Sequence, residues 1–159
     1  MQWLAKIRDD IAGSALLEGA VVTPFLCVLC FGVFEFSYYF YQQHVMATGV
    51  ADAARYIARA CDPTATATVT SAQNLASTGS TAGGTGRRVT GWDPAEVNVA
   101  FTNVDNSAGT YRGPNTIRIV NVIGNFTYVP LGFWGYFGFS IPVVQIAHSE
   151  RVIGGTVCP

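Results

Sequence analysis

The strongest constraint on this chain is an apolar run at residues 15–34, ALLEGAVVTPFLCVLCFGVF, whose one charged residue is Glu18. About 20 residues at a helical rise of roughly 1.5 Å span the hydrocarbon core of a bilayer. The run has no polar stripe, which disfavours a helix in a soluble core, and it is longer than the apolar part of a signal peptide. We therefore predict a membrane span over about 15–41, which ends in an aromatic cluster typical of a membrane surface.

Charge placement sets the expected orientation and excludes one class of partner. Lys6 and Arg8 precede the apolar run, and the next basic residue is Arg55, so the N-terminus is expected in the cytoplasm and the rest outside. The chain has nine Lys and Arg against ten Asp and Glu. Because no long basic block is present to neutralise phosphates, a nucleic-acid partner is not expected.

Two residues inside the apolar run are unusual for a membrane helix. A carboxylate there costs about 2.5–3.5 kcal/mol on insertion scales, so Glu18 is a candidate functional residue. Near the cytoplasmic end it could also reach the headgroups or be protonated. Pro24 removes a backbone donor and is expected to kink the helix.

These residues form part of a recognisable pattern. The segment GSALLE, in which Glu18 is the fifth residue after Gly13, resembles the prepilin processing site of type IV pilins and pseudopilins. Over about residues 12–61 the chain resembles TadE-like proteins, which are minor pilins or pseudopilins of the tight-adherence (Flp) pilus. The positions that carry this resemblance are Gly13, Glu18, Pro24, Glu35, the Ala53-Ala54-Arg55 stretch and Arg59. Many such pilins have a tyrosine after the glutamate, where this chain has Gly19, and this fits a minor subunit.

The resemblance implies a maturation step and an assembly role. A prepilin peptidase would cut after Gly13, which makes residues 1–13 a cytoplasmic leader and Ser14 the new N-terminus. The amine of Ser14 would be mostly cationic at neutral pH. Glu18 lies one helical turn further on and would pair with that amine or with a neighbouring subunit's.

The implied function is that of a minor pilin in the bacterial inner membrane, which takes part in pilus assembly or initiation and so in surface adherence. The implied partners are the major Flp pilin, another minor pilin, the prepilin peptidase and the inner-membrane assembly platform. An alternative is a single-pass, signal-anchored periplasmic binding or sensory module that never enters a pilus. The N-terminus of the mature protein distinguishes the two.

Beyond the membrane, three further segments are expected. An amphipathic continuation over 42–61 completes a helix of residues 14–61. Residues 62–91 are expected to hold a short helix, to about Ala76, and a flexible linker with Arg87 and Arg88 in solvent. At the outer end of the span, Glu35 is expected either to face water or to contact a neighbouring subunit.

Residues 92–159 have the pattern of a β-rich domain. EVNVAFT alternates with period two, and TIRIVNVIGNFTYV and SIPVVQIAHSERVIG are rich in β-branched residues. We predict an α+β fold in which an antiparallel sheet of about three or four strands packs on the outer half of the long helix.

One uncharged stretch, 119–147, has two interpretations. It is long enough for a second membrane segment, but its prolines and glycines favour an aromatic loop over 128–147 that joins two strands. Four aromatic residues of that loop are interface candidates, or else fold back and complete the core. They are Phe133, Trp134, Tyr136 and Phe137.

The chain has four cysteines, two inside the predicted membrane span and two beyond it. Cys27 and Cys30 lie in the membrane helix, where a thiolate is poorly solvated and redox activity is not expected. Cys61 and Cys158 both fall on the outer side, and we predict a disulfide between them. No catalytic motif or metal-ligand spacing occurs, so we expect neither an enzyme nor a cofactor or metal.

Overall fold

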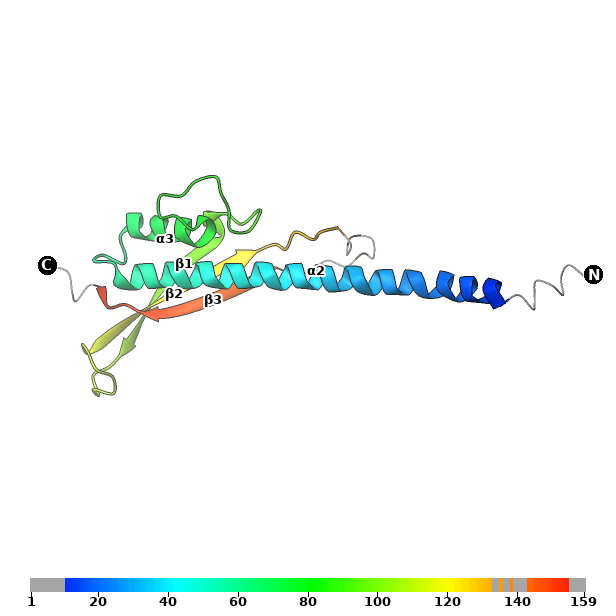
Figure 1. Ribbon diagram of the computed structural model, residues 1–159. Helices are drawn as coiled ribbons and strands as arrows, with labels where there is room; N and C mark the ends of the chain where they lie inside the picture. Colours follow the sequence, from blue (N-terminus) through cyan, green and yellow to red (C-terminus); the bar gives the residue numbers. More distant parts are fainter. Residues whose placement is uncertain (1–10, 133–134, 136–137, 139–142, 155–159) are drawn as a thin grey trace, which may run out of the picture.

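The computed structural model describes residues 11–132, 135, 138 and 143–154. Its elements in chain order are helix α2 (Ile11–Arg59), helix α3 (Thr66–Thr78), the short 3-10 helix η1 (Pro94–Glu96) and strands β1 (Val97–Asp105), β2 (Thr116–Phe126) and β3 (Val144–Arg151). Figure 1 shows α2 as a long rod whose C-terminal half is covered by α3 and the sheet, while its N-terminal half extends alone. The predicted α+β fold is thereby confirmed.

The exposure of helix α2 to its surroundings changes at Glu35. From residue 13 to residue 34 every residue is at least partly exposed, and Glu35 is the first buried residue after them. Beyond it, small and apolar side chains at helical spacing face the domain and are at most 2% exposed. They are Met46, Val50, Ala53, Ala54, Ile57 and Ala58. The amphipathic half of the rod is thus held by packing.

Helix α3 packs closely on α2. Ala72 and Ala76 are fully buried between the helices, and Gly49 of α2 lies so close that a Cβ there would clash with the carbonyl oxygen of Ala76. Helix α3 ends where Gly79 adopts a φ of 78°, in the left-handed region that favours glycine, and donates its N–H to the carbonyl of Leu75. The short helix was expected to end near Ala76; it extends to Thr78, so the expected linker begins later than predicted.

The sheet is an antiparallel meander in the order β1-β2-β3. Val99 pairs with Val122 and Val122 with His148, which places one residue from each strand in a row across the sheet. The face toward α2 buries Val97, Val120 and Val122, and Trp92 from the loop before η1 fills the space beside them. Neither the rod nor the sheet could bury this apolar surface alone.

Strand pairing decides between the two interpretations of the uncharged stretch. Residues 119–126 belong to β2, and Phe126 pairs directly with Val144 of β3. The connector 127–143 therefore starts and ends at the same end of the sheet, on neighbouring strands. A single membrane crossing would place its two ends on opposite sides of the bilayer, so the connector is not one further membrane span; residues 133–134, 136–137 and 139–142 within it lie outside the described part of the chain.

Candidate functional site

The predicted processing site lies at the start of α2 and is not covered by the rest of the described chain. Gly13 and Ser14 are exposed within the first turns of the helix, and a Cβ at Gly13 would meet nothing within 4 Å. A protease could therefore approach this peptide bond without moving other described residues. Cleavage itself stays a prediction.

Glu18 is exposed on the uncovered half of α2, one turn beyond Ser14. Within the part of the chain that the structure describes, no ion pair involves its carboxylate. The predicted charge pairing with an N-terminal amine therefore stays a prediction. The helix continues without interruption through Pro24, and next to it the hydroxyl of Thr23 donates to the carbonyl of Gly19 at 2.7 Å.

The uncovered half of α2 has the properties of a membrane anchor. Among the described residues, this helix alone is long and apolar enough to cross a bilayer, and none of its most apolar 18-residue window is buried. A core helix of a soluble domain would be covered over most of such a window. Residues 14–34 rise about 30 Å, the thickness of a hydrocarbon core. The helix therefore indicates a single-pass anchor, whose uncovered part ends at Glu35.

Glu35 is held by the connector between β2 and β3. Its side chain is 1% exposed. Oε1 accepts a hydrogen bond from the hydroxyl of Tyr128 at 2.9 Å and another from the backbone N–H of Leu131 at 2.9 Å. The expectation of a water-facing glutamate is wrong because two donors from this chain replace water. Contact with a neighbouring subunit stays a prediction.

A group of tyrosines surrounds this carboxyl group. The ring of Tyr128 lies edge-on to Tyr39 with centroids 5.3 Å apart, and 6.4 Å from the ring of Tyr38. Burial raises the pKa of Tyr128, and the hydrogen bond to Glu35 adds to this effect. We call Glu35, Tyr128, Leu131 and the rings of Tyr38 and Tyr39 the junction, because they join the anchor to the folded domain.

The sequence did not single out Tyr128 or Leu131 as partners of Glu35. The sequence offers only an indirect indication. A glutamate at the end of an apolar helix needs hydrogen-bond donors from the domain if the domain buries it. Which residues of the domain supply them depends on the fold. Gln42, two turns further along α2, is also buried, and its Oε1 has no partner among the described residues.

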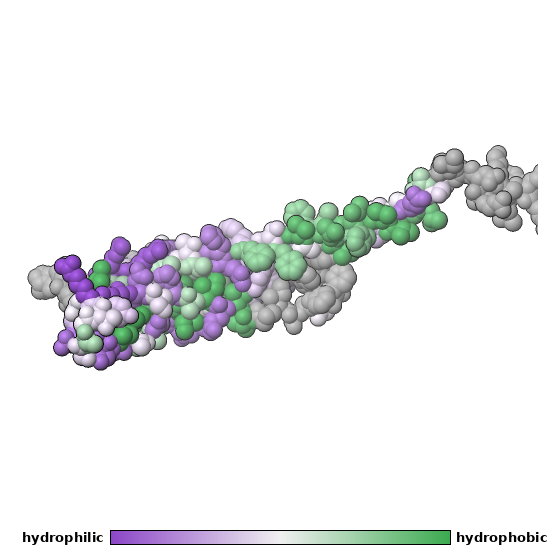
Figure 2. Space-filling view, turned by 90° about the horizontal axis from the view of Figure 1, so that it is seen from below, coloured by the Kyte–Doolittle hydropathy of each residue, from purple (hydrophilic) through white to green (hydrophobic). Residues whose placement is uncertain are grey.

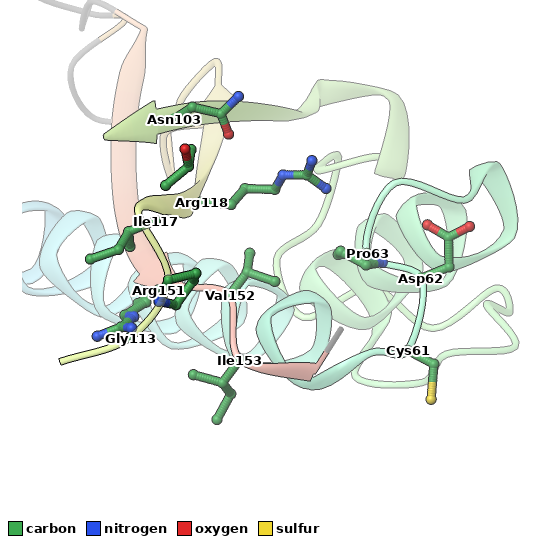
Figure 3. Close-up of a pocket in the computed structure, with 12 residues that line it drawn as sticks. Cys61, Asp62, Pro63, Asn103, Gly113, Ile117, Arg118, Arg151, Val152 and Ile153 are labelled. Atoms are coloured by element: carbon green, nitrogen blue, oxygen red, sulfur yellow. The ribbon is translucent and has the colours of Figure 1, made fainter. Parts of the chain in front are cut away.

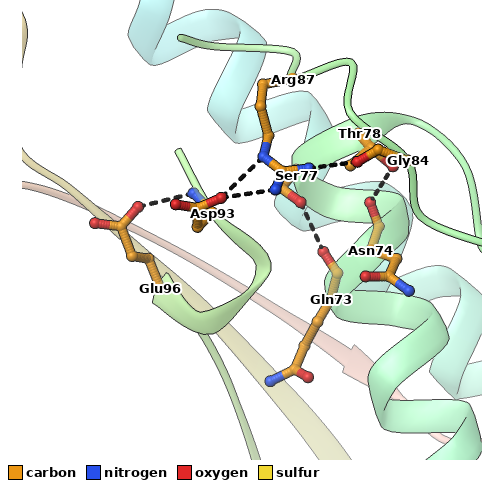
Figure 4. A network of polar contacts seen from close by, with 8 residues as sticks. All are labelled: Gln73, Asn74, Ser77, Thr78, Gly84, Arg87, Asp93 and Glu96. Carbon is orange, nitrogen blue, oxygen red and sulfur yellow. Dashed lines mark hydrogen bonds and ion pairs between the residues drawn. The ribbon is translucent and has the colours of Figure 1, made fainter. Parts of the chain in front are cut away.

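The two arginines expected in solvent form ion pairs instead. Nη2 of Arg88 lies 2.8 Å from Oδ2 of Asp52 on α2, and Nη2 of Arg87 lies 2.7 Å from Oδ1 of Asp93. Figure 4 shows Asp93 between Arg87 and Glu96, whose Oε2 accepts the N–H of Asp93 at 2.9 Å. Both arginines stay partly exposed, but Arg88 is not free in solvent, because the loop after α3 returns to α2.

An open cavity of about 630 Å³ lies at the end of the domain far from the anchor, between the turn after α2 and strands β2 and β3. Figure 3 shows Arg118 extending toward Asp62 and Pro63, while Arg151 lies near Gly113. Oδ1 of Asp62 accepts hydrogen bonds from the backbone N–H and the hydroxyl of Thr64 at 3.0 and 2.8 Å. These bonds hold the pKa of Asp62 below its usual value. Asp62 thus stabilises a turn, and we assign no chemistry to this cavity.

Several predicted residues lie outside the described part of the chain. They are Phe133, Trp134, Tyr136 and Phe137 of the connector, and Cys158. The chain before Cys158 is placed near the end of α2: the N–H of Ile153 donates to the carbonyl of Ala58 at 2.8 Å, and Gly154 lies against the backbone of Arg59 and Ala60. The Cys61–Cys158 disulfide stays a prediction. Cys27 and Cys30 are free and exposed.

Comparison with known families matches the anchor and part of its continuation. A family model described as TadE-like protein matches residues 13–55. This match confirms the resemblance over that stretch. The match indicates a protein associated with the Tad pilus. No curated protein and no solved structure matches the chain.

Proposed function

We propose that this protein is a minor pilin of a tight-adherence pilus, processed by prepilin peptidase between Gly13 and Ser14. The observation that carries the proposal is that the TadE-like match begins at Gly13, at the start of a helix whose N-terminal half the described chain leaves uncovered. An apolar rod of this kind is stable in lipid or among other apolar helices. It can therefore leave the bilayer when it enters an assembly of similar helices.

Charge pairing gives the assembly step its specificity. Inside a helix bundle, the carboxylate of Glu18 and the amine of Ser14 are each costly alone and far less costly as a pair. Since the amine exists only after cleavage, processing and assembly are linked. The proposed partners are the major Flp pilin, another minor pilin, the prepilin peptidase and the inner-membrane assembly platform. The folded domain lies on the periplasmic side until assembly, and the assembled fibre mediates adherence.

The first test is the N-terminus of the protein purified from its native host. Mass spectrometry is expected to find Ser14 as the first residue. Gly13→Leu is expected to retain residues 1–13, whereas Gly19→Leu is the matched control, because both glycines are exposed with open space around them. An intact leader on the wild-type protein, or normal processing of Gly13→Leu, would contradict the proposal and favour a plain signal anchor.

The second test concerns Glu18. Glu18→Ala is expected to insert in the membrane at the wild-type level but to disappear from the sheared pilus fraction. Thr23→Val serves as the control because it also removes a polar group from the uncovered half of α2 without removing a charge. Wild-type amounts of Glu18→Ala in sheared pili would refute the charge-pairing step.

A further inference from the structure

The connector between β2 and β3 contacts α2 at the position where the folded domain stops covering the helix. The N–H of Leu131 bonds to Glu35, which is the first buried residue of α2 after residues 13–34. Figure 1 shows the chain after β2 running along α2 toward its uncovered half. If residues 14–34 fill the hydrocarbon core, about 30 Å thick, Leu131 lies at the level of the bilayer surface.

Three apolar side chains at this end of the domain are exposed. Val129, Leu131 and Val143 are 49%, 62% and 59% exposed, and we call these three residues the apolar patch. No charged residue occurs from position 119 to position 147. The opposite end of the sheet differs: there the charged Asp105 ends β1, and Arg112 lies in the connection to β2.

Two residues of α2 close to Glu35 in the sequence are also apolar and exposed. Phe36 and Phe40 flank the junction on the helix, each more than half exposed. Figure 2 shows the apolar surface of α2 emerging from a domain whose far end is largely hydrophilic. The patch therefore lies at the level where the apolar, uncovered surface of α2 ends, and outside lipid its three apolar side chains would face water.

We propose that the apolar patch is a second membrane contact, which rests in the interface of the same bilayer where α2 leaves it. The junction fixes its depth, because Glu35 ties Leu131 to one level of the helix. With two contacts, the domain has a defined tilt relative to the membrane, which a single helix would not impose. The proposal requires α2 to be a membrane helix, but it does not require the pilin role.

The test uses the full chain in phosphatidylcholine–phosphatidylglycerol vesicles, with Cys27 and Cys30 replaced by alanine. A nitroxide label is attached at Leu131→Cys, and in separate variants at Val129→Cys and Val143→Cys. Relaxation by oxygen, which concentrates in lipid, is compared with relaxation by a nickel chelate, which stays in water. Val21→Cys on the uncovered helix is the lipid control, and Tyr111→Cys at the opposite end is the water control. The background protein without a new cysteine provides the blank.

We expect the nitroxide labels on the apolar patch to be more accessible to oxygen than to the nickel chelate, like the label at Val21→Cys. A patch that behaves like Tyr111→Cys overturns it, because the patch would then face water. Protection from both reagents also overturns it and indicates a protein partner such as a second copy. Because three patch positions are measured separately, one poorly folded variant does not remove the test. A Val21→Cys label that faces water would instead refute the membrane anchor itself.

Discussion

The hydroxyl of Tyr128 donates a 2.9 Å hydrogen bond to Oε1 of Glu35, and the two residues are 93 positions apart in the sequence. The same oxygen accepts the N–H of Leu131. One carboxyl group thus connects the last turn of the uncovered helix to the connector that leaves the sheet. A buried carboxyl group without these donors would be strongly destabilising. The pair therefore couples the position of the folded domain to the end of the anchor.

Loss of the Tyr128 hydroxyl is expected to destabilise the domain. Tyr128→Phe keeps the ring but leaves Glu35 with one donor fewer, which costs about 1–3 kcal/mol. Thermal unfolding of the full chain in detergent, followed by near-ultraviolet circular dichroism, measures the loss. Tyr111→Phe is the matched control, since Tyr111 is exposed at the opposite end of the domain. Equal stabilities of the two variants would show that the hydrogen bond is unimportant.

The same tyrosine predicts a loss of stability at high pH. Burial and, secondarily, Glu35 raise the pKa of Tyr128 in the folded protein. The folded state then keeps a proton that the unfolded state releases above about pH 10. This contribution to stability is complete below that pH and is lost as the pH rises further. Denaturant unfolding between about pH 8 and pH 11 should give a steeper fall for wild type than for Tyr128→Phe; parallel curves would argue against the coupling.

The features that the sequence predicted correctly depend on residues that are close together in the sequence. The apolar run, in which Glu18 is the one charged residue, lies in a single long helix, and the period-two alternation from Val97 forms a strand. The surroundings of Glu35 could not be predicted, because its donors come from Tyr128 and Leu131 near the other end of the chain. The pairing of Arg88 with Asp52 depends likewise on how a loop returns to α2. Hydrophobic periodicity predicts helices and strands. Polar side chains that pair across many residues of sequence can be identified only from the tertiary fold.

Gly49 provides a test of the contact between α2 and α3. A glycine inside a helix suggests a bend, yet here its role is a close approach, because an added Cβ would meet Ala76 and lie 3.2 Å from the ring of Trp92. Gly49→Ala is expected to destabilise the domain by about 1–3 kcal/mol, despite alanine's better helix propensity. Gly32→Ala, in open space on the same helix, is expected to cost nothing. Denaturant unfolding of both variants measures the difference, and a neutral Gly49→Ala would mean that the helices separate easily.

The ion pair between Arg88 and Asp52 predicts a modest coupling energy. Because both side chains are partly exposed to solvent, the pair is expected to contribute about 0.5–1 kcal/mol. A double-mutant cycle with Arg88→Ala and Asp52→Ala measures it, and Arg87→Ala combined with Asp52→Ala is the control, since Arg87 pairs with Asp93. A coupling energy for Arg88 no larger than that for Arg87 would indicate that the loop is held by packing alone.

The predicted disulfide between Cys61 and Cys158 is consistent with how the end of the chain approaches α2. Gly154 lies against the backbone of Arg59 and Ala60. Four residues of chain reach at most about 14 Å, which is enough to bring Cys158 to Cys61. Closing a loop of roughly 100 residues would add about 4–5 kcal/mol in the chain-entropy model. In the variant with Cys27 and Cys30 replaced by alanine, a maleimide–polyethylene glycol reagent should modify neither remaining thiol until a reductant is added, and reduction should lower the unfolding temperature. Modification of both thiols without reductant would rule the disulfide out.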